Sequence, residues 1–197
     1  MRNKTVSGIG WSAADAILGQ GVTFLVGIVL ARLLSPTEYG LIGIISIFIV
    51  VLNGIVDSGF SNAIIRKQDT NDADYNTMFF TNLLFSVVLY IGLYFLAPVI
   101  ATFFEREQLI ALTRAMGLIL IINALSITQV TILTKKVDFK TQTKISLISS
   151  ITSGIVGIGM AVGGCGVWSL VGQQISRQFL SSAFLWLFSN WYPKLQF

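Results

Sequence analysis

The amino-acid sequence predicts an all-α membrane protein, a polytopic bundle of six transmembrane helices. Hydrophobic residues make up 54% of the 197 residues, charged residues only 11%, and the mean hydropathy is +0.78. An ordinary soluble domain has about 25% charged residues. The apolar residues also form six runs of membrane-crossing length, whereas the strands of a membrane β-barrel alternate apolar and polar residues over about ten positions. The composition therefore excludes a soluble domain, and the run lengths favour helices.

The six apolar runs set the expected order of the helices. We expect them over residues 11–34, 39–60, 78–104, 109–133, 145–163 and 167–188. The connections are too short to fold separately, so residues 1–197 should form a single transmembrane domain. Basic residues precede the first run, as in a secretory signal, but the run exceeds a signal core of about 7 to 15 residues and contains Asp15 and Gln20. We expect it to be a retained helix.

Basic residues predict the orientation of the bundle. With the N-terminus in the cytoplasm, nine of them lie on the inner side and three on the outer side, which is the asymmetry of the positive-inside rule. Both termini should therefore be cytoplasmic. This asymmetry also accounts for the net charge of +4 without a nucleic-acid partner. The inner residues are Arg2, Lys4, Arg66, Lys67, Lys135, Lys136, Lys140, Lys144 and Lys194, and the outer ones are Arg32, Arg106 and Arg114.

The residues that usually carry catalysis or hold metals are scarce. The chain has no histidine, and Cys165 is its single cysteine, so histidine acid–base chemistry, histidine metal ligation and an intrachain disulfide are excluded. The glycines form no phosphate-binding loop. We therefore expect no enzyme activity, no cofactor and no metal.

Arg177 lies near the middle of the last run and is the main candidate for a binding residue. A charged side chain at the centre of a transmembrane helix costs about 2.5–3.5 kcal/mol on insertion scales, so it needs a polar partner or a water-filled cavity. Ser169 and Gln173 precede it at helical spacing, and Gln174 lies beside them. A guanidinium can bind phosphate oxygens through two hydrogen bonds. We predict that Arg177, Gln173 and Gln174 bind a ligand.

Acidic and amide side chains in other runs have two interpretations. Asn53 and Asp57 share one face of the second run, and Asp15 lies in the first. Carboxylates at membrane depth either couple ions or protons to movement of a ligand or serve a structural role. In the structural interpretation Asp57 caps the helix interface or pairs with Arg66, or one of the two carboxylates pairs with Arg177.

Smaller features have structural interpretations. Small residues from 146 to 157 form stripes at helical spacing, which is typical of a close packing surface between helices. The acidic stretch DTNDADYN, residues 69–76, should supply the N-cap of the third helix. Asn123 adds a polar side chain to the fourth run, and Thr23 lies on the same face of the first run as Asp15.

Four segments together resemble polysaccharide exporters of the multidrug/oligosaccharidyl-lipid/polysaccharide superfamily. They are LARLLSPTEYGLIGI (30–44), DSGFSNAIIRKQ (57–68), KKVDFK (135–140) and GGCGVWSLVGQQ (163–174). The resemblance implies a flippase of the bacterial inner membrane that carries a polyprenyl-diphosphate-linked oligosaccharide to the outer leaflet. It also implies two helical lobes around a central cationic cavity, in which Arg177 would bind the diphosphate.

The chain departs from that family in its length. Family members have a second set of helices, whereas this sequence resembles the N-terminal lobe alone, with a tail, NWYPKLQF, similar to the linker between lobes. The expected partners are the lipid-linked oligosaccharide, membrane lipids, and a second lobe or further copies of the chain that close the cavity.

Three alternatives stay open. A cation-coupled multidrug antiporter of the same superfamily would favour acidic cavity residues over Arg177. A membrane-embedded glycan polymerase would be expected to carry a large extracytoplasmic loop, and the outer connections are short. A non-functional fragment would leave polar groups on its inner face exposed to lipid, where they are costly.

Overall fold

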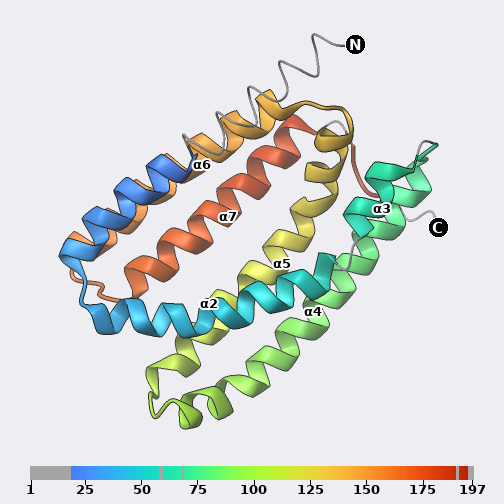
Figure 1. Cartoon of the computed structure of the whole chain (residues 1–197). Helices are drawn as coiled ribbons and strands as arrows, with labels where there is room; N and C mark the ends of the chain where they lie inside the picture. Colours follow the sequence, from blue (N-terminus) through green and yellow to red (C-terminus); the bar gives the residue numbers. More distant parts are fainter. Residues whose placement is uncertain (1–18, 58–59, 68, 190, 195–197) are drawn as a thin grey trace.

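The computed structural model describes residues 19–57, 60–67, 69–189 and 191–194, and these residues form helices joined by short connections (Figure 1). The all-α prediction is confirmed for the described part of the chain. A first helix over Gly19–Leu33 is followed by α2 (Pro36–Asp57), α3 (Phe60–Arg66), α4 (Asp72–Phe103), α5 (Gln108–Lys135), α6 (Phe139–Val162) and α7 (Trp168–Phe188).

Four helices, α2, α4, α5 and α6, are long and apolar enough to cross a membrane. The chain is therefore a multi-pass membrane protein. Helix α7 has 21 residues, but Arg177 and three glutamines make it less apolar than a typical span. The described part of the first helix is shorter than a span. The predicted count of six spans additionally requires both of these helices to cross.

Several helix boundaries differ from the prediction because polar first turns do not register in a search for apolar runs. Helix α4 begins at Asp72 rather than at 78, since Asn71 and Asp74 form a reciprocal capping box with bonds of 2.9 and 3.1 Å. Helix α6 begins at Phe139 rather than at 145, because the Asp138 carboxylate accepts from the Thr141 amide at 3.2 Å. The predicted N-cap in the acidic stretch is confirmed.

The connection expected over 61–77 was wrong in one respect, because it contains the short helix α3. The described part of the preceding helix α2 runs to Asp57, and the description resumes at Phe60 with α3. At the other end of α2, Ser35 and Glu38 form a capping box, which lets that helix begin earlier than predicted. The early start of α2 follows from these local hydrogen bonds rather than from hydrophobicity.

Helix α5 is the centre of the bundle. It packs against α4 on one side and α7 on the other, and α2 lies across it (Figure 1). Leu112, Met116 and Leu120 are almost completely buried. A Cβ atom at Gly117 would lie 2.9 Å from the ring of Tyr90, so glycine permits the close approach of α4 and α5. Such packing matters in a membrane because lipid tails are as apolar as leucine and supply no hydrophobic driving force.

The small-residue stripe on α6 is a packing surface, as predicted. A Cβ atom at Gly157 would lie 2.9 Å from the Cβ of Gln173 on α7. A Cβ at Gly154 would lie 2.6 Å from Val26 on the first helix. Glycine therefore lets α6 approach both neighbours closely, and Gln173 packs directly against Gly157.

The four segments that carry the family resemblance contact one another in pairs. At the end where α2, α5 and α7 begin, the Glu38 carboxylate lies against Gly166, whose φ of +55° suits glycine. At the opposite end, the Lys135 ammonium donates to the carbonyl oxygens of Ile64 and Lys67 and to Thr70 Oγ1. Each pair ties together two parts of the sequence that lie far apart.

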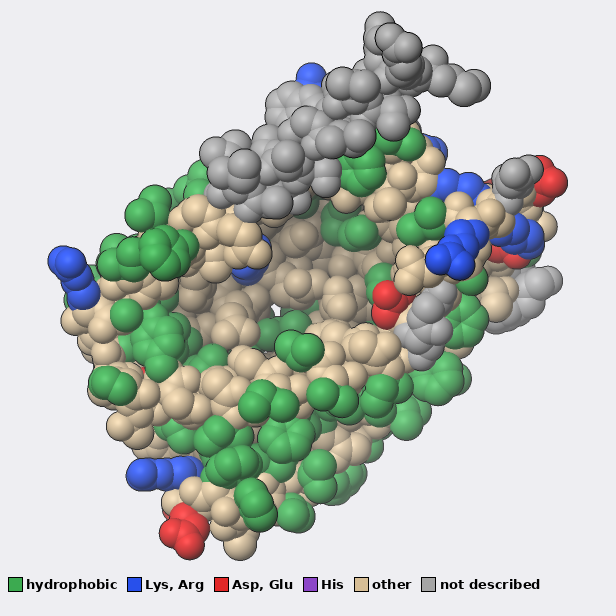
Figure 2. All heavy atoms as spheres, viewed as in Figure 1, with side chains coloured by type: hydrophobic (Ala, Val, Ile, Leu, Met, Phe, Trp, Pro, Cys, Tyr) green, Lys and Arg blue, Asp and Glu red, His purple; other side chains and the backbone are tan. Residues whose placement is uncertain are grey.

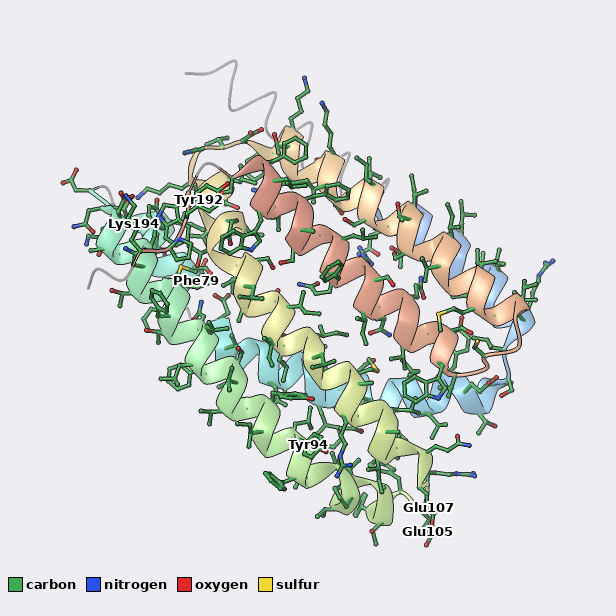
Figure 3. The ribbon with its side chains drawn as sticks, turned by 180° about the vertical axis from the view of Figure 1, so that it is seen from behind. Phe79, Tyr94, Glu105, Glu107, Tyr192 and Lys194 are labelled. Atoms are coloured by element: carbon green, nitrogen blue, oxygen red, sulfur yellow. The ribbon has the colours of Figure 1, made fainter. Side chains whose placement is uncertain are left out.

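The described part of the tail, residues 191–194, packs back onto the bundle. Phe79 makes edge-on ring contacts with Trp186 and Trp191, with centroids 6.0 and 6.1 Å apart. The backbone amide of Lys194 donates to Asn76 Oδ1 at 3.0 Å. Figure 3 shows Phe79, Tyr192 and Lys194 gathered at one end of the molecule, far from Tyr94, Glu105 and Glu107.

Candidate functional site

A polar cavity of about 510 Å³ lies between the first helix, α5, α6 and α7. Figure 2 shows a hollow on the face seen in Figure 1, between α2 and the α6–α7 side, with walls that are largely polar side chains and backbone. The volume falls within the roughly 300–1,000 Å³ of small-molecule sites. The lining residues are Thr23, Ile119, Ser146, Ser149, Gln173, Gln174, Arg177, Gln178 and Ser181.

Helix α7 contributes two neighbouring rows of side chains to this cavity. Gln173, Arg177 and Ser181 are spaced by four residues along one row, and Gln174 and Gln178 along the other. Residues four apart lie above one another on a helix, so each row presents a continuous polar edge. Arg177 lies about 14 Å from the start of α7 at roughly 1.5 Å per residue. Its predicted position near the middle of the helix is confirmed.

The Arg177 guanidinium is only partly engaged by the protein. It is half-buried, and Nη1 donates to Thr23 Oγ1 at 3.3 Å, while the Thr23 hydroxyl donates to the carbonyl oxygen of Gly19 at 2.9 Å. A guanidinium carries five N–H donors. Within the described residues no other hydrogen bond of Arg177 is formed. Most of its donors are therefore not engaged by the described residues.

The structural alternative of an ion pair with Arg177 is partly tested. The ion pair within the described residues joins Lys67 and Asp74 at 2.8 Å. Asp57 instead accepts from the Ser61 hydroxyl at 2.6 Å, at the end of α2, and pairs with neither Arg66 nor Arg177. Asp15 lies outside the described residues. The alternatives in which Asp57 pairs with Arg66 or with Arg177 are therefore wrong.

The three predicted ligand-binding residues come together in the cavity. Gln173 and Gln174 both line it beside Arg177, and in the described part of the chain neither amide group forms a hydrogen bond. Ser149 adds a hydroxyl that is buried and has no hydrogen-bond partner among the described residues. A ligand would satisfy these groups, and their role in binding stays a prediction.

Asn53 and Asp57 do not line the cavity. Asn53 Oδ1 accepts from Asn123 Nδ2 at 2.8 Å, which connects α2 to α5 across 70 residues of sequence. Asn123 Oδ1 in turn accepts from Gln178 Nε2 at 3.1 Å. Three amide side chains therefore form one chain of hydrogen bonds from α2 through α5 to the cavity wall on α7.

Gln178 is a cavity residue that was not predicted from the sequence. Its position four residues after Gln174 was a usable signal, because both must lie on the same row of α7. Asn123 and Thr23 were recognisable from the sequence as polar residues, without a specific role. Their partners lie on other helices, so only the folded structure identifies them.

The charge of the cavity limits what it can bind. Arg177 is its single charged residue among those described, and none of the described lining residues is acidic. The other polar groups are amides and hydroxyls, which both donate and accept. The described lining therefore suits a ligand with an anionic part and neutral hydrogen-bonding groups.

These features define a multi-pass membrane protein with a polar cavity that contains one arginine. The family described as polysaccharide biosynthesis protein matches residues 29–197. The chain belongs to this family, which confirms the resemblance seen in the sequence. The family consists of membrane proteins for polysaccharide biosynthesis, and the name of one relative describes transport rather than an enzymatic reaction. Both points agree with the expectation that the chain is not an enzyme.

Three curated relatives show how much of such a protein the chain represents. The succinoglycan biosynthesis transport protein ExoT of Rhizobium meliloti is 25% identical over 98% of this chain and 40% of its own length. The teichuronic acid biosynthesis protein TuaB of Bacillus subtilis is 26% identical over 76% of the chain and 31% of its length. The lipopolysaccharide biosynthesis protein WzxC of Escherichia coli is 24% identical over 62% and 25%.

The chain thus spans well under half the length of these relatives. No solved structure matches the chain.

Proposed function

We propose that the chain is the N-terminal lobe of a flippase that moves a polyprenyl-diphosphate-linked oligosaccharide from the cytoplasmic to the outer leaflet of a bacterial inner membrane. The observation that carries this proposal is the cavity around Arg177, with one cation, several free amides and hydroxyls, and no acidic residue in its described lining. A diphosphate provides oxygen pairs for the guanidinium, and sugars provide hydroxyl groups for the amides.

The energetic cost of Arg177 supports a role in binding. A charge near the middle of a membrane helix costs about 2.5–3.5 kcal/mol on insertion scales. The described residues offset it with a single hydroxyl contact at 3.3 Å and no carboxylate. A diphosphate would supply the missing negative charge. In this proposal Arg177 binds the diphosphate, and Gln173 and Gln174 hydrogen-bond to phosphate or sugar oxygens.

A second lobe completes the proposed transporter. The hollow in Figure 2 is open on one face, and the relatives are more than twice as long as this chain. The second lobe, or a further copy of the chain, would close that face, and rocking of the two lobes would open the cavity to each side in turn. All six predicted helices would span the membrane, with both termini in the cytoplasm.

The remaining predicted residues have other roles in this proposal. Asp15 and Asp57 are the candidates for coupling an ion or proton to transport. Asn53 holds α2 to α5 through Asn123. The antiporter alternative is less well supported, because it requires acidic groups in the cavity and the described lining has none.

Transport in reconstituted vesicles tests the proposal. The protein as its gene encodes it is placed in vesicles that contain a polyprenyl-diphosphate-linked oligosaccharide, and the glycan reaching the opposite leaflet is measured with a membrane-impermeant glycosidase. We expect transport that a cationic drug does not inhibit. Transport of the drug in place of the glycan would overturn the proposal in favour of the antiporter.

A further inference from the structure

We propose that Gln178 is a specificity-determining residue that accepts a hydrogen bond from a hydroxyl of the sugar next to the diphosphate, and that Asn123 positions it. This inference rests on the proposed function and deepens it, because it assigns the sugar a place in the cavity separate from that of the diphosphate. The chain of amide hydrogen bonds between α2, α5 and α7 supports this assignment.

The nitrogen end of the Gln178 amide bonds to Asn123 in the structure. Gln178 Nε2 donates to Asn123 Oδ1 at 3.1 Å, and Asn123 Nδ2 donates to Asn53 Oδ1 at 2.8 Å. Asn123 therefore uses both ends of its amide, and its oxygen faces Gln178. One of the two N–H donors of the Gln178 amide is directed at Asn123, and its carbonyl oxygen forms no hydrogen bond within the described residues.

The Gln178 oxygen is available to a ligand. Gln178 lines the cavity, and its Oε1 atom forms no hydrogen bond in the described part of the chain. The oxygen has no partner among those residues and is not fully buried, so it retains access to the cavity. A carbonyl oxygen accepts hydrogen bonds and cannot donate them. The matching ligand group is therefore a donor such as a sugar hydroxyl.

Arg177 and Gln178 would bind different parts of the ligand. The guanidinium has donors only, so it binds phosphate oxygens. The Gln178 oxygen is an acceptor and would repel those same oxygens. The two residues are consecutive on α7 and both line one cavity. A ligand in which a hydroxyl-bearing ring adjoins a diphosphate satisfies both, whereas a bare diphosphate satisfies only Arg177.

Asn123 acts on the ligand through Gln178 and does not line the cavity itself. Without its oxygen, the Gln178 amide would be free to rotate and to present either end. A leucine at 123 should therefore weaken sugar selectivity without removing the diphosphate contact. A protonated aspartate at 123 keeps an acceptor for Gln178 and a donor for Asn53, so it should preserve selectivity.

Binding of two probes to the protein as its gene encodes it, in lipid nanodiscs, tests the inference. The probes are polyprenyl diphosphate and polyprenyl diphosphate with one attached hexose. We expect Gln178→Leu to weaken binding of the sugar-bearing probe roughly two- to tenfold, the range of one lost hydrogen bond, and to change the affinity for the bare diphosphate less than about twofold. Asn123→Leu should do the same, and Asn123→Asp should restore the preference.

The controls separate this inference from the proposed function. Gln108→Leu makes the same change at a glutamine outside the cavity and should leave the affinities for both probes unchanged. Retained binding of the bare diphosphate shows that each variant is folded. Equal weakening of both probes by Gln178→Leu, or no weakening, would overturn the sugar subsite while leaving the proposed function standing. If the unsubstituted protein binds neither probe, the proposed function fails and the subsite with it.

Discussion

The Arg177 guanidinium on α7 donates to the hydroxyl of Thr23 on the first helix, 3.3 Å away and 154 positions apart in sequence. This contact joins two walls of the polar cavity, and among the described residues it is the one hydrogen bond of the guanidinium. The position of the charge in the cavity thus depends on packing between helices at opposite ends of the chain.

Thr23→Val tests this contact, because valine keeps the shape of threonine and removes the hydroxyl. We expect glycan transport to fall roughly two- to tenfold, corresponding to about 0.5–1.5 kcal/mol for one hydrogen bond. The measurement is the initial rate of transport in vesicles at matched protein content. Thr102→Val, on an exposed hydroxyl at the end of α4, is the control. An unchanged rate in Thr23→Val would show that the contact does not position Arg177.

Gly157→Ala tests the close packing of α6 and α7. The added Cβ would lie 2.9 Å from the Cβ of Gln173, so we expect a loss of about 1–3 kcal/mol from overpacking. Thermal unfolding in detergent measures the effect as a lower Tm. Gly159→Ala is the matched control on the same helix, where nothing lies within 4 Å of the new atom. Equal Tm values for the two variants would contradict the account.

Gly166→Ala tests the contact between the two family segments at the start of α2 and α7. Both Gly164 and Gly166 have positive φ, so alanine at either position strains the backbone by about 1–2 kcal/mol. At Gly166 the new Cβ would also lie 2.6 Å from Glu38 Oε1, whereas at Gly164 it meets nothing within 4 Å. We expect the larger fall in Tm for Gly166→Ala. A larger fall for Gly164→Ala would exclude the Glu38 contact.

Lys135→Met tests the link at the other end of the bundle. Methionine keeps a long apolar stem but loses the ammonium that holds Ile64, Lys67 and Thr70. We expect faster hydrogen–deuterium exchange over α3 and the connection after it. Lys136→Met, at an exposed neighbouring position, should leave that exchange unchanged. Protection of α3 that survives Lys135→Met would mean that other contacts hold it.

The sequence predicted the helical class and the place of Arg177 because both depend on local properties. Membrane-length runs of apolar residues specify helices, and a charge in the middle of such a run needs a polar environment. The starts of α4 and α6 were missed because Asn71 and Asp138 cap polar first turns that a search for apolar runs does not include. Hydrogen bonds set those boundaries.

The candidate site was predictable only along α7. Gln173, Gln174 and Arg177 share one helix, so their spacing brings them together. The partners of that surface come from other helices, as Thr23 and Asn123 do. Spacing along a single helix contains no information about such contacts. Asn53 was therefore left with two interpretations, coupling or structural, and its bond to Asn123 became visible only in the structure.

The most direct test of the central claim is glycan export in cells that carry Arg177→Ala in the whole transporter. Export and the amount of protein in the membrane are measured together, with Arg32→Ala as a control at an exposed arginine outside the cavity. The account predicts that Arg177→Ala abolishes export at a normal protein level and that Arg32→Ala does not. Normal export by Arg177→Ala would contradict the claim that Arg177 binds the diphosphate.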